Sequence, residues 1–331
     1  SKNITRVHLI NTSSSNQVFS GTLYHQTGDL LGAEKTPLHD SPVPPGARLI
    51  FSAEDLELKL GVDSWNGPAM LEITGDESFS VMSRLENPSG LITNTNCVTE
   101  NSLTNIESPS SADKSYLRFI NTTDNEYAAI TASLYKKSGE PTGSRDTVLL
   151  AGLRPKQQVW ITEQDLIDKF GADWSEVGML EVEPIQGLKL INLNYSDEQE
   201  TFFNFSCSEN GSDLERIYLQ TSSSSRNVSF THLLNKSEKN QSFTGTIYGS
   251  DGSVLGLENQ PLHEGSLSPK SRLIFSSQDI ESIFGIPPWE GPAILEIDGS
   301  ERFSLVTKLT SPSGLISNTN CVTKEQVHNL L

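Results

Sequence analysis

The sequence predicts an all-β chain of three tandem β-sandwich domains, each with one short helix. Three observations lead to this prediction: an internal repeat of roughly 110 residues, short β-branched or alternating segments bounded by turn residues, and one helix signature in each repeat. A chain of 331 residues is long enough for three such domains. We place them at residues 1–107, 108–220 and 221–331, and the middle one is the most divergent.

The repeat is clearest between the first and third segments, which align without a gap at an offset of 224 residues. Trp65 then corresponds to Trp289, and the run 88–98 matches 312–322 with one change. The middle repeat lacks the Pro-Ser-Gly-Leu-Ile part of that run. Serine clusters at 108–111 and 222–225 are interpreted as short polar linkers that few contacts cross.

The strands of one repeat follow from its apolar pattern and its turn residues. The turn signal Gln26-Thr27-Gly28-Asp29 predicts a hairpin, and Gly252 marks the same turn in the third repeat. In the first repeat we expect six strands: 6–11, 18–25, 47–51, 69–74, 79–86 and 91–98.

One helix should interrupt the strands of each repeat, as a crossover between the two sheets at one end of the sandwich. Ser52 is a good N-cap, acidic residues follow it in the first turn, and Gly61 suits the position after the last turn. The other two repeats carry the same pattern at Thr162 and Gly171 and at Ser276 and Gly285. Short strands of this number in about 110 residues are typical of an immunoglobulin-like or fibronectin-like sandwich.

Three segments of the middle repeat, RFINTT, LYKKSGEPTG and PKQQVWITEQDL, resemble the tandem Ig-like repeats of large secreted or surface-attached bacterial proteins. The junction at 320–322, followed by 327–330, is similar to the inter-repeat signature of such arrays. The resemblance covers all three repeats. It implies a repeat architecture but no particular function, because this sandwich hosts many unrelated roles.

The net charge of −18 argues against nucleic-acid and anionic-membrane partners, which need clustered Lys and Arg. With no apolar run of 18 residues, we expect no membrane insertion. The start of the chain lacks an apolar signal core, so either a signal peptide has been removed or the sequence is a fragment. We expect a secreted or cell-surface protein without a cofactor, whose acidity permits weak Ca²⁺ binding. Sequons such as those at Asn11, Asn121 and Asn235 are interpreted as an accident of an Asn- and Ser-rich bacterial composition.

The cysteines Cys97, Cys207 and Cys321 occupy the same place near the end of each repeat. Equivalent positions of an extended array are a whole module apart, whereas a disulfide needs Cα atoms within about 7 Å, so we expect no intrachain bridge. Two interpretations stay open: a buried strand cysteine that acts as a small apolar residue, and an interchain disulfide or partner contact. One cysteine per module has no metal-site spacing.

Two tryptophans and two histidines are candidate ligand contacts. Trp65 and Trp289 each precede Gly-Pro-Ala, and flat aromatic faces can stack on sugar rings, although a position beside the helix end also suits core filling. His39 corresponds to His263, and recurrence suits a structural or interface role better than catalysis.

The sequence contains no His-Glu-x-x-His, no Gly-x-Ser-x-Gly and no identifiable Ser-His-Asp arrangement, so we expect no enzyme. The sequence therefore predicts a non-catalytic extracellular array that serves as a stalk, a fibre component or a multivalent adhesin. Protein partners or self-assembly would suit it. The alternative is a polysaccharide-binding module of a secreted protein.

Overall fold

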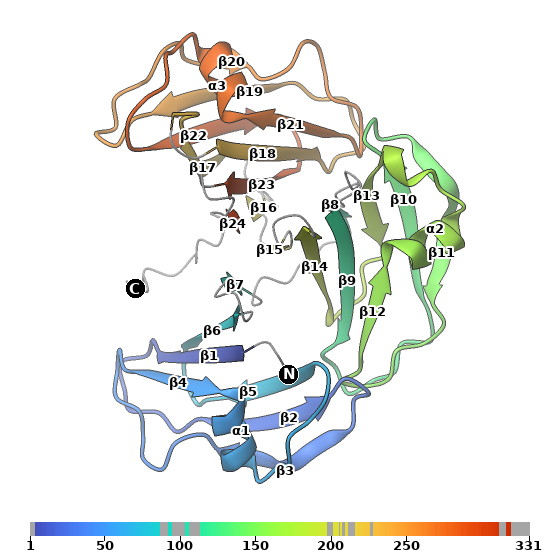
Figure 1. Cartoon of the computed structure of the whole chain (residues 1–331), viewed down its shortest axis with the longest axis vertical. Helices are drawn as coiled ribbons and strands as arrows, with labels where there is room; N and C mark the ends of the chain where they lie inside the picture. The colour runs from blue at the N-terminus through green and yellow to red at the C-terminus, as the bar shows by residue number, and fades with distance from the viewer. Residues whose placement is uncertain are drawn as a thin grey trace.

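The computed structural model describes residues 4–86, 92–94, 103–105, 113–196, 201–204, 206, 209–210, 216–225, 228–310 and 316–318. These residues form small antiparallel sheets with three short α-helices, so the all-β prediction is confirmed. The sheets group into three units, which follow one another along an arc (Figure 1). No helix of the described residues is long and apolar enough to cross a bilayer.

Unit 1 has one sheet in the order β4-β1-β6-β7 and a second in the order β3-β2-β5. Its elements are β1 (Ile4–Asn11), β2 (Ser20–His25), β3 (Leu30–Pro37), β4 (Arg48–Ser52), α1 (Ala53–Leu60), β5 (Ala69–Thr74), β6 (Phe79–Glu86) and β7 (Ile92–Asn94).

Unit 2 pairs its strands as β12-β9-β14-β15 and as β11-β10-β13-β8. Its elements are β8 (Leu103–Asn105), β9 (Asp113–Asn121), β10 (Ile130–Lys136), β11 (Pro141–Leu150), β12 (Gln158–Thr162), α2 (Glu163–Phe170), the 3-10 turn η1 (Trp174–Glu176), β13 (Val177–Val182), β14 (Leu188–Ser196) and β15 (Thr201–Asn204).

Unit 3 has the orders β16-β23-β18-β21, with β24 also on β23, and β17-β22-β19-β20. Its elements are β16 (Glu209–Asn210), β17 (Arg216–Ser222), β18 (Val228–Asn235), β19 (Phe243–Tyr248), β20 (Gln260–Pro261), β21 (Arg272–Ser276), α3 (Ser277–Phe284), β22 (Pro292–Gly299), β23 (Phe303–Thr310) and β24 (Ile316–Asn318).

Each unit encloses one apolar core between its two sheets. In unit 1, Leu9 and Phe51 come from one sheet and Leu23 from the other, and all three are buried. Leu56 and Leu60 of α1 close the end of this core. Units 2 and 3 have equivalent cores. Burial of large apolar side chains stabilises each unit by about 1.5–3 kcal/mol per side chain.

The three helices begin and end as predicted. At α1, Ser52 Oγ accepts a hydrogen bond from the Asp55 backbone N–H, and the Asp55 carboxylate accepts one from the Ser52 N–H. Gly61 ends the helix with a left-handed φ of 63°. The same capping box and glycine end occur in α2 and α3. Each helix connects a strand of one sheet to a strand of the other, so the predicted crossover is confirmed.

The strand predictions for unit 1 are confirmed at 69–74 and 79–86, whereas β3 was missed. Of the strand predicted over 91–98, residues 92–94 form β7 and the rest lies outside the described residues.

The serine cluster 222–225 was predicted to be a linker that few contacts cross, and this prediction is wrong. The cluster connects β17 to β18 inside unit 3. Ser223 Oγ and Ser224 Oγ donate hydrogen bonds to the Glu281 carboxylate at 3.0 and 2.8 Å. Such short side chains bond readily to nearby groups. The cluster 108–111 lies outside the described residues.

Units 2 and 3 each contain a strand from the segment assigned to the preceding repeat. β8 pairs with β13 of unit 2, and β17 pairs with β22 of unit 3. In unit 1 the counterpart of β13 and β22 is β5. No described residue pairs with the second edge of β5. On the inner side of the arc, β15 lies beside both β7 and β24 (Figure 1).

Candidate functional site

Units 1 and 2 meet where a hairpin contacts a loop. The hairpin follows β2, and the loop precedes β12. The backbone N–H of Gln158 donates to the carbonyl of Gln26 at 2.8 Å, and the Arg154 guanidinium donates to the carbonyl of Thr27. Gly28 has a φ of 88°, and a Cβ on it would overlap the carbonyl oxygen of Pro155. The close approach of the two backbones therefore requires glycine here.

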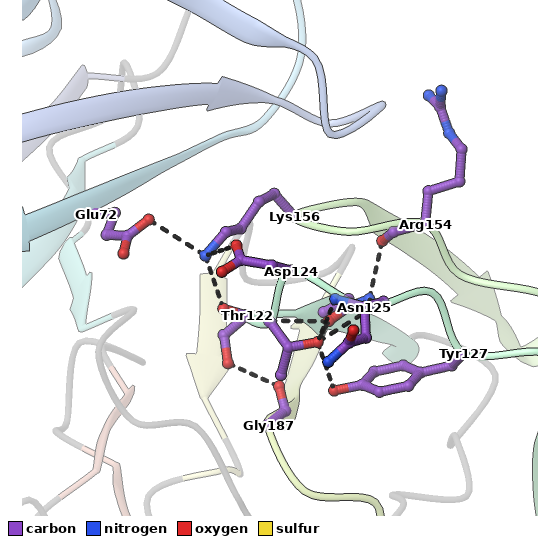
Figure 2. Close-up of polar contacts among 10 residues, drawn as sticks. Glu72, Thr122, Asp124, Asn125, Tyr127, Arg154, Lys156 and Gly187 are labelled. Carbon is purple, nitrogen blue, oxygen red and sulfur yellow. Dashed lines mark hydrogen bonds and ion pairs between the residues drawn. The ribbon is translucent and has the colours of Figure 1, made fainter. Parts of the chain in front are cut away.

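Lys156 joins the two units electrostatically (Figure 2). Its Nζ lies 3.3 Å from the Glu72 carboxylate of unit 1 and 3.2 Å from the Asp124 carboxylate of unit 2, and it donates to the carbonyl of Thr122 at 2.9 Å. Burial disfavours the charge, but hydrogen bonds to Asp124 and Glu72 outweigh it and raise the pKa of Lys156. The lysine therefore stays charged within the interface.

Units 2 and 3 repeat this arrangement. The backbone N–H of Arg272 donates to the carbonyl of Lys137 at 3.1 Å. Lys270 Nζ lies 2.7 Å from the Glu181 carboxylate of unit 2 and 2.8 Å from the Glu238 carboxylate of its own unit. Gly139 has a φ of 88°, and a Cβ on it would overlap the carbonyl oxygen of Pro269. Two interfaces of this chain thus share one geometry.

Apolar side chains accompany both lysines. Tyr135 and Met179 of unit 2 form a buried cluster with Leu234 of unit 3. The Tyr135 hydroxyl donates to the Glu181 carboxylate at 2.8 Å, and burial together with this carboxylate raises the pKa of Tyr135. Between units 1 and 2, Met70 packs on a cluster of Ile120, Ile191 and Leu193. The interfaces combine apolar burial with charged pairs, which favours a fixed orientation of neighbouring units.

Buried asparagines hold the loops that carry the lysines. Asn121 is fully buried, its Nδ2 donates to the carbonyls of Asn125 and Arg154 at 2.7 and 3.0 Å, and its Oδ1 accepts from the Thr123 N–H. Asn11 and Asn235 are buried in equivalent networks. These three sequon asparagines therefore have a structural role, which their recurrence in every repeat could have indicated.

The candidate ligand contacts lie apart from these interfaces. Trp65 and Trp289 are half-buried, and each packs against the core of its own unit. His39 Nδ1 lies 2.7 Å from the carbonyl oxygen of Ser41 in its own turn, whereas His263 is exposed.

The cysteines Cys97, Cys207 and Cys321 lie outside the described residues. Within the part of the chain that the structure describes, no three His, Cys, Asp or Glu side chains form a group that could hold a metal ion.

Sequence reasoning missed the two lysines and their glutamate partners. Lys156 and Lys270 both follow a proline and precede a strand that leads into a capped helix. That recurrence was a visible signal. Their partners Glu72 and Glu181 lie on β5 and β13, in different units, so the pairing itself has no local sequence pattern.

No protein-family model and no curated protein matches this chain. Among solved structures, "Structure of infectious bursal disease virus Gx strain" aligns over 95% of this chain and 73% of that chain, at 10% identity and a TM-score of 0.17. "Crystal structure of infectious bursal disease virus VP2 subviral particle" aligns over 97% and 76%, at 11% identity and a TM-score of 0.15. Scores this low carry no argument about fold or function.

Proposed function

We propose that the chain is a non-catalytic structural array, placed outside the cell or on its surface as a stalk, a fibre component or a multivalent adhesin. The observation that carries this proposal is the hairpin-to-loop contact that recurs between units 1 and 2 and between units 2 and 3. Units that are merely tethered need no such contacts, whereas nearest-neighbour interfaces are what hold a repeat array in one shape.

We further propose that each unit is an immunoglobulin-like or fibronectin-like sandwich. Two antiparallel sheets face one core in every unit, and the strands are short. These features suit that class of sandwich. The crossover helix is an addition to it.

The surface chemistry supports an extracellular place and protein partners. A net charge of −18 keeps such a chain soluble and disfavours binding to nucleic acid. Polysaccharide binding through Trp65 and Trp289 stays a prediction, as does an interchain role for the cysteines. Electrophoresis of the native protein without reductant would test the second.

Two glycines at equivalent positions in the hairpins of units 2 and 3 provide a matched test of the array. Gly139→Ala and Gly252→Ala both place a Cβ at a left-handed φ, of 88° and 80°, which costs about 1 kcal/mol or more in either variant. Only Gly139→Ala sets that Cβ against the neighbouring unit, because no atom lies within 4 Å of the Cβ position at Gly252.

Small-angle scattering should show a larger radius of gyration for Gly139→Ala than for wild type, and no change for Gly252→Ala. Equal radii for all three folded proteins would contradict a shape-persistent array. Expansion of both variants would mean that strain in the hairpin, and not docking, sets the shape.

A further inference from the structure

One edge of β5 in unit 1 corresponds to an edge that units 2 and 3 each cover with an additional strand. In unit 2 this edge belongs to β13 and pairs with β8, which comes from the first repeat. In unit 3 it belongs to β22 and pairs with β17, which begins in the second repeat. Among the described residues, none pairs with this edge of β5. The described part of unit 1 is therefore one strand short of the sandwich that units 2 and 3 complete.

Without this strand, part of the core of unit 1 stays accessible to solvent. Leu180 and Leu295 are 0% exposed beside the added strands, whereas their counterpart Leu71 is only half-buried. In unit 3 the added strand β17 also packs on β23, whose first five residues are buried. The counterpart of β23 in unit 1 is β6, and every residue of β6 is half-buried. A strand added to β5 therefore buries apolar surface as well as pairing backbone groups.

The sequence of β5 does not protect this edge. Sheet edges that stay single are commonly protected by a bulge, a proline or a lysine. β3, at the other edge of the same sheet, has a register shift against β2 and carries Gly32 and Lys35 at positive φ. β5 pairs with β2 in unbroken register from Ala69 to Thr74, and Glu72 is its only charged residue. A regular, unprotected edge is what strand addition requires.

The contact with unit 2 does not occupy this edge. Glu72 reaches unit 2 with its side chain, which pairs with Lys156. β13 shows that such a pair and an added strand coexist, because β8 lies along its edge while its Glu181 pairs with Lys270 of the next unit. The backbone edge of β5 can therefore take a strand while units 1 and 2 remain in contact.

The end of the third repeat has the sequence counterpart of β8. β24 corresponds to β7 at the offset of 224 that relates the first and third repeats. The same offset leads from Leu103–Asn105, which form β8, to Val327-His328-Asn329. The sequence at 96–99 recurs unchanged at 320–323. The segment that supplies an added strand to unit 2 is thus present a second time in the sequence.

Within one chain, units 3 and 1 lack the contact that accompanies each added strand. Unit 1 supplies β8 to unit 2 and also touches it through its hairpin and the loop of Lys156, and units 2 and 3 do the same through the loop of Lys270. Gly46 stands at the loop position in unit 1, and Gly252 at the hairpin position in unit 3. No atom lies within 4 Å of the Cβ position at either glycine. A donor from another copy therefore suits unit 1 better than one from the same chain.

We propose that the edge of β5 binds residues 327–329 of a second copy of this chain as an added antiparallel strand. In the register of β8 on β13, His328 lies opposite Leu71 and Asn329 lies opposite Met70. Chains then join head to tail, because the end of the third repeat completes unit 1 of the next copy. This inference rests on the proposed array and names the chain itself as the partner.

Cysteine cross-linking tests the register of the added strand. In a background with the three native cysteines changed to serine, Met70→Cys and Asn329→Cys place two thiols opposite each other, with Cα atoms about 5 Å apart. After mild oxidation, electrophoresis without reductant should show dimers and longer ladders. The matched control combines Met70→Cys with His328→Cys, whose thiols lie on opposite faces of the sheet. It should give at least about fivefold less cross-linked product.

Sedimentation velocity of the full chain tests the same contact without engineered thiols. Wild type in reductant should show concentration-dependent association up to about 100 µM. His328→Pro removes the backbone N–H that corresponds to that of Thr104 and should weaken the association at least about tenfold. His328→Ala keeps this N–H and should associate as wild type does. Both changes leave the sequence of all three cores untouched.

Three results would overturn the proposal: no association of wild type, association that His328→Pro does not weaken, or equal cross-linking of the two cysteine pairs. Cross-links confined to single chains would also overturn it, because the donor would then come from the same copy. Scattering at low concentration distinguishes this from failure of the array. If the array fails, Gly139→Ala has the same radius of gyration as wild type, whereas failure of strand addition alone leaves their difference intact.

Discussion

Lys270 offers the sharpest test of the contact between units 2 and 3. Lys270→Met removes the charge but keeps a side chain of similar length at the same backbone position. It breaks contacts of 2.7 Å to Glu181 and 2.8 Å to Glu238. The lysine side chain is 11% exposed and that of Glu181 is 25% exposed, whereas Glu238 is 81% exposed and can remain in water.

The size of the effect follows from this partial burial. Exposed ion pairs contribute about 0.2–1 kcal/mol, and breaking a fully buried pair costs about 3–5 kcal/mol. The pair of Lys270 and Glu181 lies between these limits. Tyr135 still donates to the Glu181 carboxylate in the variant, which limits the cost of the unpaired charge. We therefore expect a coupling free energy of about 1–2 kcal/mol between Lys270 and Glu181.

A double-mutant cycle measures this coupling. The free energy of unfolding is determined by urea denaturation for wild type, Lys270→Met, Glu181→Gln and the double variant. The matched control is the pair of Lys239 and Glu301, in which the lysine side chain is 71% exposed and both partners belong to unit 3. Its coupling should stay below about 0.5 kcal/mol.

The reasoning is refuted if the coupling of Lys270 with Glu181 is no larger than that of the surface pair. It is also refuted if 1 M NaCl removes both couplings equally, because a partly buried pair is screened less than an exposed one.

Three further outcomes are expected. Burial, together with nearby Arg and Lys charges, lowers the pKa of His8 and of His232 below 6.5, so the unfolded chain takes up protons more readily than the folded chain and the Tm should fall as the pH drops below 6.5. Calorimetry of H8L/H232L should show a weaker dependence of the Tm on pH. Hydrogen exchange should be faster in β5 than in β13 and β22, because no described residue pairs with the second edge of β5, and equal rates would contradict this. Trp65→Ala and Trp289→Ala should each lower the free energy of unfolding by about 2 kcal/mol or more, because each tryptophan packs on the core of its unit. If these variants instead keep their stability and lose saturable glycan binding, that result would support the sugar-binding prediction.

Local signals predicted the elements whose structure is decided locally. The helix from Ala53 to Leu60 has its cap, its acidic first turn and its terminal glycine within ten consecutive residues, and all three features are present as expected. β3 was missed because Leu30–Pro37 mixes an exposed face with Gly32 and Lys35, both at positive φ, so no alternating pattern marks it. The cluster at 222–225 was misinterpreted because its partner Glu281 lies far along the chain.

The interfaces depend on how folded units meet, which composition and periodicity do not encode. Lys270 and Glu181 are 89 residues apart, and only the completed sheets bring them together. A loop lysine with a glutamate on a distant strand looks like ordinary surface charge in the sequence. The repeat alignment did contain one usable clue, namely that the same loop has lysine twice and glycine once.

That clue has a physical interpretation. A left-handed backbone suits glycine and costs other residues about 1–3 kcal/mol, so Gly46 is the residue that the conformation alone would favour. Lys156 and Lys270 accept this strain where a neighbouring unit supplies a glutamate, and a pair of this burial contributes about 1–2 kcal/mol. Strain and attraction nearly cancel, so these lysines add little net stability. Their effect is to fix the orientation of one unit on the next.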